Sequence, residues 1–176
     1  NLSLIKILNE NFGIKSGYIT TTHAYTGDQK IHDSPHKDLR RARAAAKSII
    51  PTTTGAAKAI GKIFPELVGK LEGVGIRVPV LNGSLTDIIC VVDKKGTVDQ
   101  INQLFKSAAN GSLSSILSYT EDPIVSNDII GHSSSCIFDS KLSVVNDNTI
   151  RVIGWYDNEA GYSNRIIDLI TKISSF

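Results

Sequence analysis

The spacing of apolar residues along this chain changes several times between helical and strand-like, which predicts a domain of mixed helices and strands. Over residues 1–12 the apolar side chains recur three and four positions apart, as on one face of a helix, and Gly13 follows as a suitable end. Residues 17–25 are rich in β-branched and aromatic side chains and predict a strand that leads to His23. A polar segment without periodicity follows over residues 26–48, and its length is typical of a functional loop.

The rest of the chain predicts more strands than helices. An apolar stripe predicts a helix that Thr97 opens and that Asn110 and Gly111 end. Because the strands are not regularly interleaved with helices, we expect an α+β fold, with a mostly antiparallel or mixed sheet of about seven to eight strands covered by helices. The other predicted helices are residues 56–65 and 166–173, and the other strands are residues 75–80, 86–92, 116–119, 134–138, 142–145 and 150–156.

Composition is that of a globular protein without an obvious charged or membrane partner. A chain of 176 residues, with 41% apolar and 20% charged side chains, fits one domain with a buried core. The net charge of +2 is too small to predict nucleic acid as a partner, and no apolar run is long enough to predict a membrane span. The sequence contains no methionine and opens inside a helical pattern, so we expect it to be the C-terminal part of a longer protein.

The two cysteines predict buried structural thiols and no metal ion. Cys90 and Cys136 each lie among apolar neighbours, and neither belongs to a Cys-x-x-Cys pair or lies near histidines at metal-ligand spacing. Thiols of this kind are typical of a reducing compartment.

His23, at the end of the first predicted strand, is the first candidate for chemistry. A neutral imidazole can take a proton from a thiol or give one to an oxygen at physiological pH. A hydrogen-bonded structural histidine is the alternative. His32, His36 and His132 lie in polar segments, where we expect exposed side chains.

An arginine cluster and a Thr-Gly turn indicate anion binding. Arg40, Arg41 and Arg43 could form an ordinary solvated face, but they lie shortly before Thr54 and Gly55, where a predicted helix begins. Guanidinium groups bind phosphate with two parallel hydrogen bonds, and a helix start offers free N–H groups. Helix capping alone would also explain a threonine there.

Two polar positions further along add to this set. Arg77 is a lone charge inside an apolar strand, so it needs an acidic side chain or a bound anion as its partner. Asn158, between Asp157 and Glu159, ends a strand at a turn, where turn chemistry alone accounts for such residues. The candidates together comprise one histidine, several anion donors and an amide, without a nucleophile.

Four long motifs resemble the phosphorylating glyceraldehyde-3-phosphate dehydrogenases. They are THAYTGDQ, PHKDLRRARAAAKSIIPTTTGAAKAIGK, PELVGKLEGVGIRVP and WYDNEAGYSNRIIDLI, and the likeness covers essentially all 176 residues. The resemblance implies that residues 1–176 are the catalytic C-terminal domain, without the family's N-terminal NAD-binding Rossmann domain. It also implies that residues 26–48 are the S-loop, which in the family reaches a neighbouring subunit's cofactor site within a cytoplasmic homotetramer.

The family's glycolytic reaction converts D-glyceraldehyde 3-phosphate, NAD and phosphate to 1,3-bisphosphoglycerate and NADH. A cysteine thiolate attacks the aldehyde, hydride passes to NAD, and phosphate then cleaves the thioester. The family's nucleophile lies in a Ser-Cys-Thr-Thr-Asn motif, which would precede Asn1, and neither Cys90 nor Cys136 occupies the matching position. We therefore expect the isolated chain to be inactive.

The same resemblance implies a division of roles among the candidate residues. His23 would be the base that activates the thiol, and Arg77 would lie close enough to serve both phosphate groups. The substrate's own phosphate would be held by Thr26, Asp28 and Arg77, the inorganic phosphate by Arg41, Thr54 and Gly55, and the nicotinamide carboxamide by Asn158 with Tyr162 nearby.

Three alternatives stay open on this reading. Erythrose-4-phosphate dehydrogenases share most of these motifs, and a non-catalytic assembly or interaction fragment is the alternative from another class. NADP in place of NAD is the third, because the adenosine pocket would lie outside this chain, although the setting of Pro35 favours NAD by resemblance.

Overall fold

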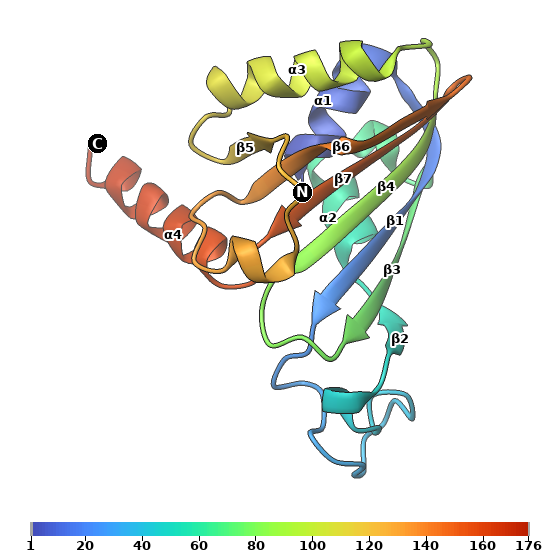
Figure 1. The fold of residues 1–176 in the computed structure, drawn as a ribbon, viewed down its shortest axis with the longest axis vertical. Helices are drawn as coiled ribbons and strands as arrows, with labels where there is room; N and C mark the ends of the chain where they lie inside the picture. Colours follow the sequence, from blue (N-terminus) through green and yellow to red (C-terminus); the bar gives the residue numbers. More distant parts are fainter. Residues whose placement is uncertain (1, 176) are drawn as a thin grey trace.

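The computed structural model describes residues 2–175, and for residues 56–58 it describes the backbone alone. These residues form one seven-stranded mixed sheet with helices packed on one face (Figure 1), which confirms the predicted α+β class. In chain order the elements are α1 (Leu2–Phe12), β1 (Ile14–Ala24), β2 (Ile50–Thr53), α2 (Ala56–Ile63), β3 (Leu71–Val78), β4 (Ser84–Val92), α3 (Val98–Asn110), β5 (Leu117–Thr120), β6 (Cys136–Asn146), β7 (Thr149–Tyr156) and α4 (Ala160–Ile173), with short 3-10 turns at Ala45–Lys47, Pro65–Leu67 and Ser126–Ile129.

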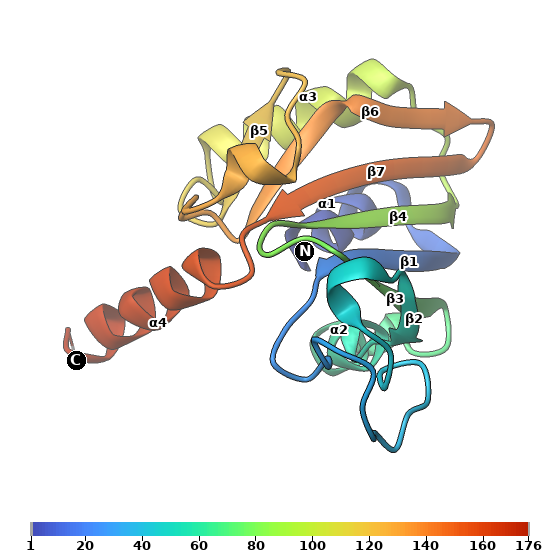
Figure 2. The ribbon, with the colours of Figure 1, turned by 60° about the horizontal axis from the view of Figure 1, so that its bottom comes forward.

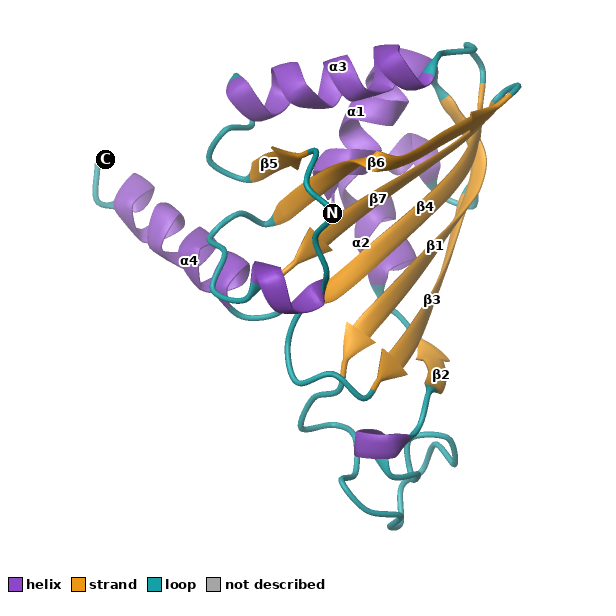
Figure 3. Cartoon of the chain, viewed as in Figure 1, coloured by secondary structure: helices purple, strands orange, loops and turns teal. Residues whose placement is uncertain are grey.

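The strand order across the sheet is β2-β3-β1-β4-β7-β6-β5. The pairs β1–β3 and β5–β6 are parallel, and the other four neighbouring pairs are antiparallel. A parallel pair brings the same ends of two strands to one edge of the sheet. The C-terminal ends of β1 and β3 therefore lie together, and the long loop that follows β1 begins there (Figures 1 and 3).

The core lies between the sheet and the helices α1, α2 and α3. The apolar face predicted for the first helix is buried, including Leu4 and Leu8, and it packs with Ile88 of β4 and Val152 of β7 in one cluster. Alternate residues point to the opposite face, where Tyr18, for example, is exposed, because side chains alternate along a strand. This alternation decides which strand residues reach the helix-covered face.

Helix α3 has both ends of its predicted pattern in place. The side chain of Thr97 accepts a hydrogen bond from the N–H of Gln100, and the Gln100 side chain accepts one from the N–H of Thr97, a reciprocal cap. On its buried face, Phe105 stacks on Phe138 of β6 with ring centroids 3.9 Å apart. The helix is thereby fixed to the far half of the sheet, away from His23.

Two strand predictions are wrong in detail. The segments predicted as separate strands at 134–138 and 142–145 are parts of the single strand β6. The polar residues that break the apolar pattern are buried and bonded within the sheet: Asp139 accepts from Nε1 of Trp155 at 3.0 Å, and Ser140 donates to the carbonyl of Thr120 at 2.8 Å. Strand β2 was missed, because Pro51 weakens a strand prediction everywhere except at a sheet edge, where β2 lies.

Helix α4 extends away from the body of the domain (Figures 1 and 2). It begins at Ala160, six residues before the predicted start, and its large apolar side chains Ile167, Leu169, Ile170 and Ile173 are exposed. Within residues 2–175, no helix combines the length and the apolarity that crossing a membrane requires.

Candidate active site

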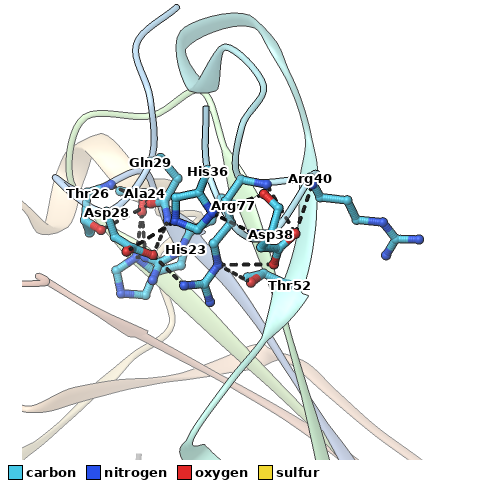
Figure 4. A network of polar contacts seen from close by, with 11 residues as sticks. His23, Ala24, Thr26, Asp28, Gln29, His36, Asp38, Arg40, Thr52 and Arg77 are labelled. Carbon is cyan, nitrogen blue, oxygen red and sulfur yellow. Dashed lines mark hydrogen bonds and ion pairs between the residues drawn. The ribbon is translucent and has the colours of Figure 1, made fainter. Parts of the chain in front are cut away.

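His23 and Arg77 lie side by side at the ends of the two central parallel strands. His23 is the penultimate residue of β1, and the strand register pairs it with Arg77 in β3. Nη1 of Arg77 lies 2.5 Å from Nδ1 of His23, and it donates to the carbonyl oxygen of Ala24 at 3.0 Å. Figure 4 shows both side chains among polar residues of the loop after β1. The candidate base and the lone strand charge therefore meet in one place.

The position of Arg77 is linked to the tautomer of His23. Nδ1 of His23 lies 2.6 Å from the carbonyl oxygen of Ala24, which can only accept a hydrogen bond. With the hydrogen on Nδ1, this carbonyl is satisfied and Nε2 is left as a proton acceptor. In the other tautomer, Nδ1 accepts from Arg77, which can only donate, and Nε2 carries the hydrogen. Moving the guanidinium away from Nδ1 therefore favours the tautomer that can act as a base.

His23 is poised to be neutral. Desolvation is the main cause that lowers its pKa below the ordinary 6.5, and the charge of Arg77 lowers it further. The contact with the Ala24 carbonyl and the charge of Glu159 act in the opposite direction without reversing the result. The ring of Tyr156 packs edge-on against the imidazole, with centroids 6.0 Å apart, and contributes to its burial.

The sequence predicted that Arg77 needs either an acidic side chain or a bound anion as its partner. Within the described residues, no acidic side chain forms an ion pair with it. Arg41, Arg43, Arg151 and Arg165 each lie within ion-pair distance of a carboxylate, whereas no carboxylate pairs with Arg77 in the part of the chain that the structure describes. Burial lowers the pKa of Arg77, as does the charge of Arg41, while Tyr156 and the carboxylate of Asp28, which is not paired with Arg77, act in the opposite direction. A guanidinium stays protonated in proteins throughout. A half-buried cation without a carboxylate leaves the other option, a bound anion.

Arg41 lies on the loop beside this pair and is held in a fixed orientation. Its Nη1 donates to Oδ2 of Asp28 at 2.5 Å, and its Nε donates to the hydroxyl of Thr52 in β2 at 2.8 Å. The charge of Arg41 contributes to lowering the pKa of Arg77. Asp28 orients Arg41, an arginine of the predicted anion site.

A buried glutamine, Gln29, links Thr26 to Asp28 by hydrogen bonds, and sequence reasoning did not predict a role for it. The backbone N–H and the hydroxyl of Thr26 both donate to Oε1 of Gln29, at 2.9 and 3.2 Å. Nε2 of Gln29 in turn donates to Asp28 at 3.3 Å. His36 was expected to be exposed, but its side chain is largely buried, and its Nε2 lies 3.9 Å from Oδ1 of Asp28.

Thr54 and Gly55 lead into the helix α2, as the sequence predicted, and they follow β2, which the sequence did not predict. Gly55 precedes the first residue of the helix, which has no side-chain cap, and a Cβ at Gly55 would meet nothing within 4 Å. Because β2 runs antiparallel to β3, with Ile50 opposite Arg77, Thr54 lies beyond Thr52 as seen from Arg77. Arg41, which contacts Thr52, is the link between the two groups of anion donors.

Asn158 lies just beyond β7 and is joined to the His23 strand through one serine. The hydroxyl of Ser84 lies 2.5 Å from Oδ1 of Asn158 and 3.3 Å from the N–H of Ala24. Tyr162, in the first turn of α4, is exposed. The structure therefore connects Asn158 to the end of β1, whereas Tyr162 lies on the surface near it in sequence.

Neither cysteine is suited to be the nucleophile. Burial raises the pKa of the Cys90 thiol to about 12, and burial also raises that of Cys136. Both are free thiols in the helix-covered core cluster, as the sequence predicted. Among the described residues, no three or more His, Cys, Asp or Glu side chains are grouped so that they could hold a metal ion.

The chemistry that this arrangement supports combines anion binding with proton transfer. Two guanidinium groups and a helix start can bind phosphate oxygens, and a neutral imidazole beside them can accept a proton. An amide lies on the other side of the imidazole strand, reached through Ser84. The site thus defines a domain that combines anion-binding groups with an imidazole able to accept a proton.

Comparison with known families identifies that domain. The model of the glyceraldehyde 3-phosphate dehydrogenase C-terminal domain matches residues 2–158, so the chain belongs to this family. Glyceraldehyde-3-phosphate dehydrogenase 2 of Streptomyces avermitilis is 59% identical over 173 residues, which are 98% of this chain and 52% of that protein. The enzymes called glyceraldehyde-3-phosphate dehydrogenase in Streptomyces coelicolor and Mycobacterium tuberculosis are 57% and 55% identical, over 98% and 97% of this chain and 52% and 50% of their own lengths. The chain thus spans about half the length of the curated relatives it matches.

Proposed function

We propose that residues 1–176 are the catalytic domain of an NAD-dependent, phosphorylating glyceraldehyde-3-phosphate dehydrogenase, whose Rossmann domain belongs to a preceding part of the protein. The family membership supports the class of enzyme. The observation that carries the proposal is the half-buried Arg77, which lies against His23 and has no carboxylate partner in the described chain. A triose phosphate supplies both an anion for the guanidinium and a reacting carbonyl within reach of an imidazole.

In this proposal the two arginines divide the phosphate groups between them. Arg77, with Thr26 and Asp28, holds the phosphate of the substrate. Arg41, with Thr54 and Gly55, holds the inorganic phosphate, and Arg77 serves this second phosphate as well. Asp28 contributes by orienting Arg41 through the 2.5 Å hydrogen bond. A guanidinium group binds phosphate oxygens through two parallel hydrogen bonds, so each arginine offers a pair of donors that matches one phosphate group.

His23 acts in this proposal as the general base and later as a donor to the substrate oxygen. A substrate phosphate draws the guanidinium of Arg77 away from Nδ1. His23 then adopts the tautomer in which Nδ1 carries the hydrogen and donates a hydrogen bond to the Ala24 carbonyl. Nε2 is left free to accept the proton of a cysteine thiol, which a part of the protein preceding residue 1 would supply. The lowered pKa of His23 keeps the imidazole in its neutral, basic form at physiological pH.

The cofactor contact assigned to this domain is a small one. Asn158 presents an amide that matches a carboxamide, which offers both a donor and an acceptor, and the exposed ring of Tyr162 lies one turn further along. When bound, NAD accepts the hydride that the substrate carbon loses. The proposal includes a cytoplasmic homotetramer, in which the loop of residues 26–48 contacts a neighbouring subunit.

A direct assay tests the proposal. The full-length protein that carries this domain is expected to produce NADH from D-glyceraldehyde 3-phosphate, NAD and phosphate, and to do so faster than from erythrose 4-phosphate. The isolated 176-residue chain is expected to give no more NADH than a control without enzyme. Preference for erythrose 4-phosphate would replace the substrate by the alternative one, and inactivity of the full-length protein with both aldehydes would refute the enzyme proposal.

A further inference from the structure

The side chain of Asn158 is oriented by a buried serine that belongs to none of the roles above. Ser84 opens β4 and is 1% exposed, and its Oγ lies 2.5 Å from Oδ1 of Asn158. The same Oγ lies 3.3 Å from the backbone nitrogen of Ala24. A serine in this position touches both the strand that carries His23 and the amide assigned to the cofactor.

The donor and acceptor roles at this serine are determined by its neighbours. The N–H of Ala24 can only donate, so Oγ of Ser84 accepts from it. The side chain of Tyr156 also hydrogen-bonds to this hydroxyl, whose oxygen has two lone pairs and can accept from both Ala24 and Tyr156. The single hydrogen of the hydroxyl is then directed to Oδ1 of Asn158, which can only accept. The carbonyl end of the amide is therefore held against β4, and the amide nitrogen Nδ2 is the end that Ser84 does not hold.

The backbone at Asn158 is fixed by a second set of contacts. Oδ1 of Asn82 accepts from the N–H of Asn158 at 3.2 Å, and Nδ2 of Asn82 donates to Asp157 at 2.7 Å. The buried carboxylate of Asp157 also accepts from the backbone N–H groups of Gly131, Glu159 and Ala160, at 2.8, 2.7 and 2.7 Å. With the backbone held in this way, the remaining freedom of Asn158 is in its side chain.

The carboxylate of Asp157 stays ionised in this cage. Burial is the largest single influence and would raise its pKa, but the hydrogen bonds from Gly131, Ala160, Glu159 and Asn82 together lower the pKa below its ordinary value. A charged acceptor makes stronger hydrogen bonds than a neutral one. The turn that carries Asn158 is thus rigid, and a single hydroxyl suffices to select between the two orientations of the amide.

We propose that Ser84 is a positioning residue for cofactor binding: it holds the Asn158 carbonyl and thereby presents Nδ2 as a hydrogen-bond donor to the nicotinamide carboxamide. This inference rests on the proposed function, because it needs Asn158 to contact the cofactor. Ser84 also joins the amide to Ala24, whose carbonyl contacts His23 and Arg77. One hydroxyl therefore sets the amide relative to the imidazole.

The test is a double-mutant cycle in the full-length protein, with the dissociation constant for NAD measured by calorimetry. Ser84→Ala is expected to weaken NAD binding about tenfold, the loss of roughly one hydrogen bond. Asn158→Ala is expected to weaken it at least as much. Because Ser84 acts through Asn158, adding Ser84→Ala to Asn158→Ala is expected to cause no further loss.

Ser140→Ala provides the matched control. Ser140 is also a buried serine, 5% exposed, whose hydroxyl donates one hydrogen bond, to the carbonyl of Thr120 at 2.8 Å. It lies on β6, which β7 separates from β4, and it is expected to leave NAD affinity unchanged. The KM for glyceraldehyde 3-phosphate is expected to change much less in Ser84→Ala than the KM for NAD.

A second variant keeps the proposal testable if Ser84→Ala does not fold. Asn158→Asp retains an oxygen for Ser84 to bond but offers no N–H donor, so it is expected to weaken NAD binding as much as Asn158→Ala. Wild-type affinity in Asn158→Asp would overturn the proposed orientation. If Ser84→Ala weakens NAD binding equally in the wild-type protein and in Asn158→Ala, the positioning role is overturned while the proposed function stands. Wild-type affinity in Asn158→Ala would overturn both the inference and the cofactor role proposed for Asn158.

Discussion

Replacing His23 with asparagine is expected to lower kcat/KM for glyceraldehyde 3-phosphate in the full-length protein by about 10²–10⁴-fold, the usual contribution of a positioned general base. Asparagine can still bond to the Ala24 carbonyl but cannot take a proton. The control is His32→Asn, because His32 is exposed on the loop that follows β1 and the variant is expected to retain wild-type kinetics. A His23→Asn enzyme with near wild-type kcat/KM would show that the imidazole is structural, the alternative that the sequence left open.

The same substitution has an expected effect on the pH dependence of stability. The folded protein lowers the pKa of His23 below 6.5, so between this lowered pKa and pH 6.5 the unfolded chain binds more protons at His23 than the folded chain does. The free energy of unfolding therefore falls as pH decreases through this window, and His23→Asn is expected to lose this part of the decrease. Urea unfolding of both proteins at a series of pH values measures the difference, and parallel curves would show that His23 keeps its ordinary pKa in the folded state.

Replacing Arg77 with glutamine is expected to raise the KM for glyceraldehyde 3-phosphate by about 10²-fold or more, since hydrogen bonds to charged groups contribute roughly 1.5–3 kcal/mol each. The loss is expected to be smaller for glyceraldehyde, which lacks the phosphate. Arg40→Gln is the control, because Arg40 is an exposed arginine of the loop after β1 whose side chain makes no hydrogen bond or ion pair with a site residue among those described. Equal losses for the phosphorylated and unphosphorylated aldehydes would contradict the assignment of Arg77 to the substrate phosphate.

Within the described residues, Arg77 is partly buried and has no ion pair with a carboxylate, whereas Arg40 is exposed and Arg41 is paired with Asp28. Arg41 is neutralised in part by Asp28, whereas Arg77 contacts only an imidazole and a carbonyl oxygen among its hydrogen-bond partners in the described chain. A guanidinium next to an imidazole disfavours protonation of the ring unless an anion balances the second positive charge. The contact thus adds to the effect of burial in lowering the pKa of His23, and it leaves Arg77 available for the phosphate that we propose.

Residue types and periodicity predicted the helices and the two central strands because these elements carry strong apolar patterns. The sequence also singled out His23 and Arg77, but separately, since only the parallel register of β1 and β3 brings them together. The polar residues Asp139 and Ser140 made one strand look like two, because their sheet partners, Trp155 and Thr120, are distant in sequence.

The supporting residues of the site were the hardest to predict. Gln29, Ser84 and Asn82 are common polar residues in loops or at a strand start, where their types carry no specific chemistry. The sequence analysis did consider Asp157, but ordinary turn chemistry was enough to account for an aspartate at that position. What gives these residues a role is the contact each makes across the fold, and pattern analysis of one sequence contains no such contacts.

The most direct test of the shared His23–Arg77 site is an NMR titration of the full-length protein with inorganic phosphate, following the imidazole resonances of His23. Phosphate is expected to shift these resonances and to raise the pKa of His23, because an anion beside the ring stabilises the protonated form. In Arg77→Gln the same additions are expected to leave His23 unchanged. His23 resonances that ignore phosphate in the wild-type protein, or that respond equally in Arg77→Gln, would contradict a common site for the imidazole and the anion.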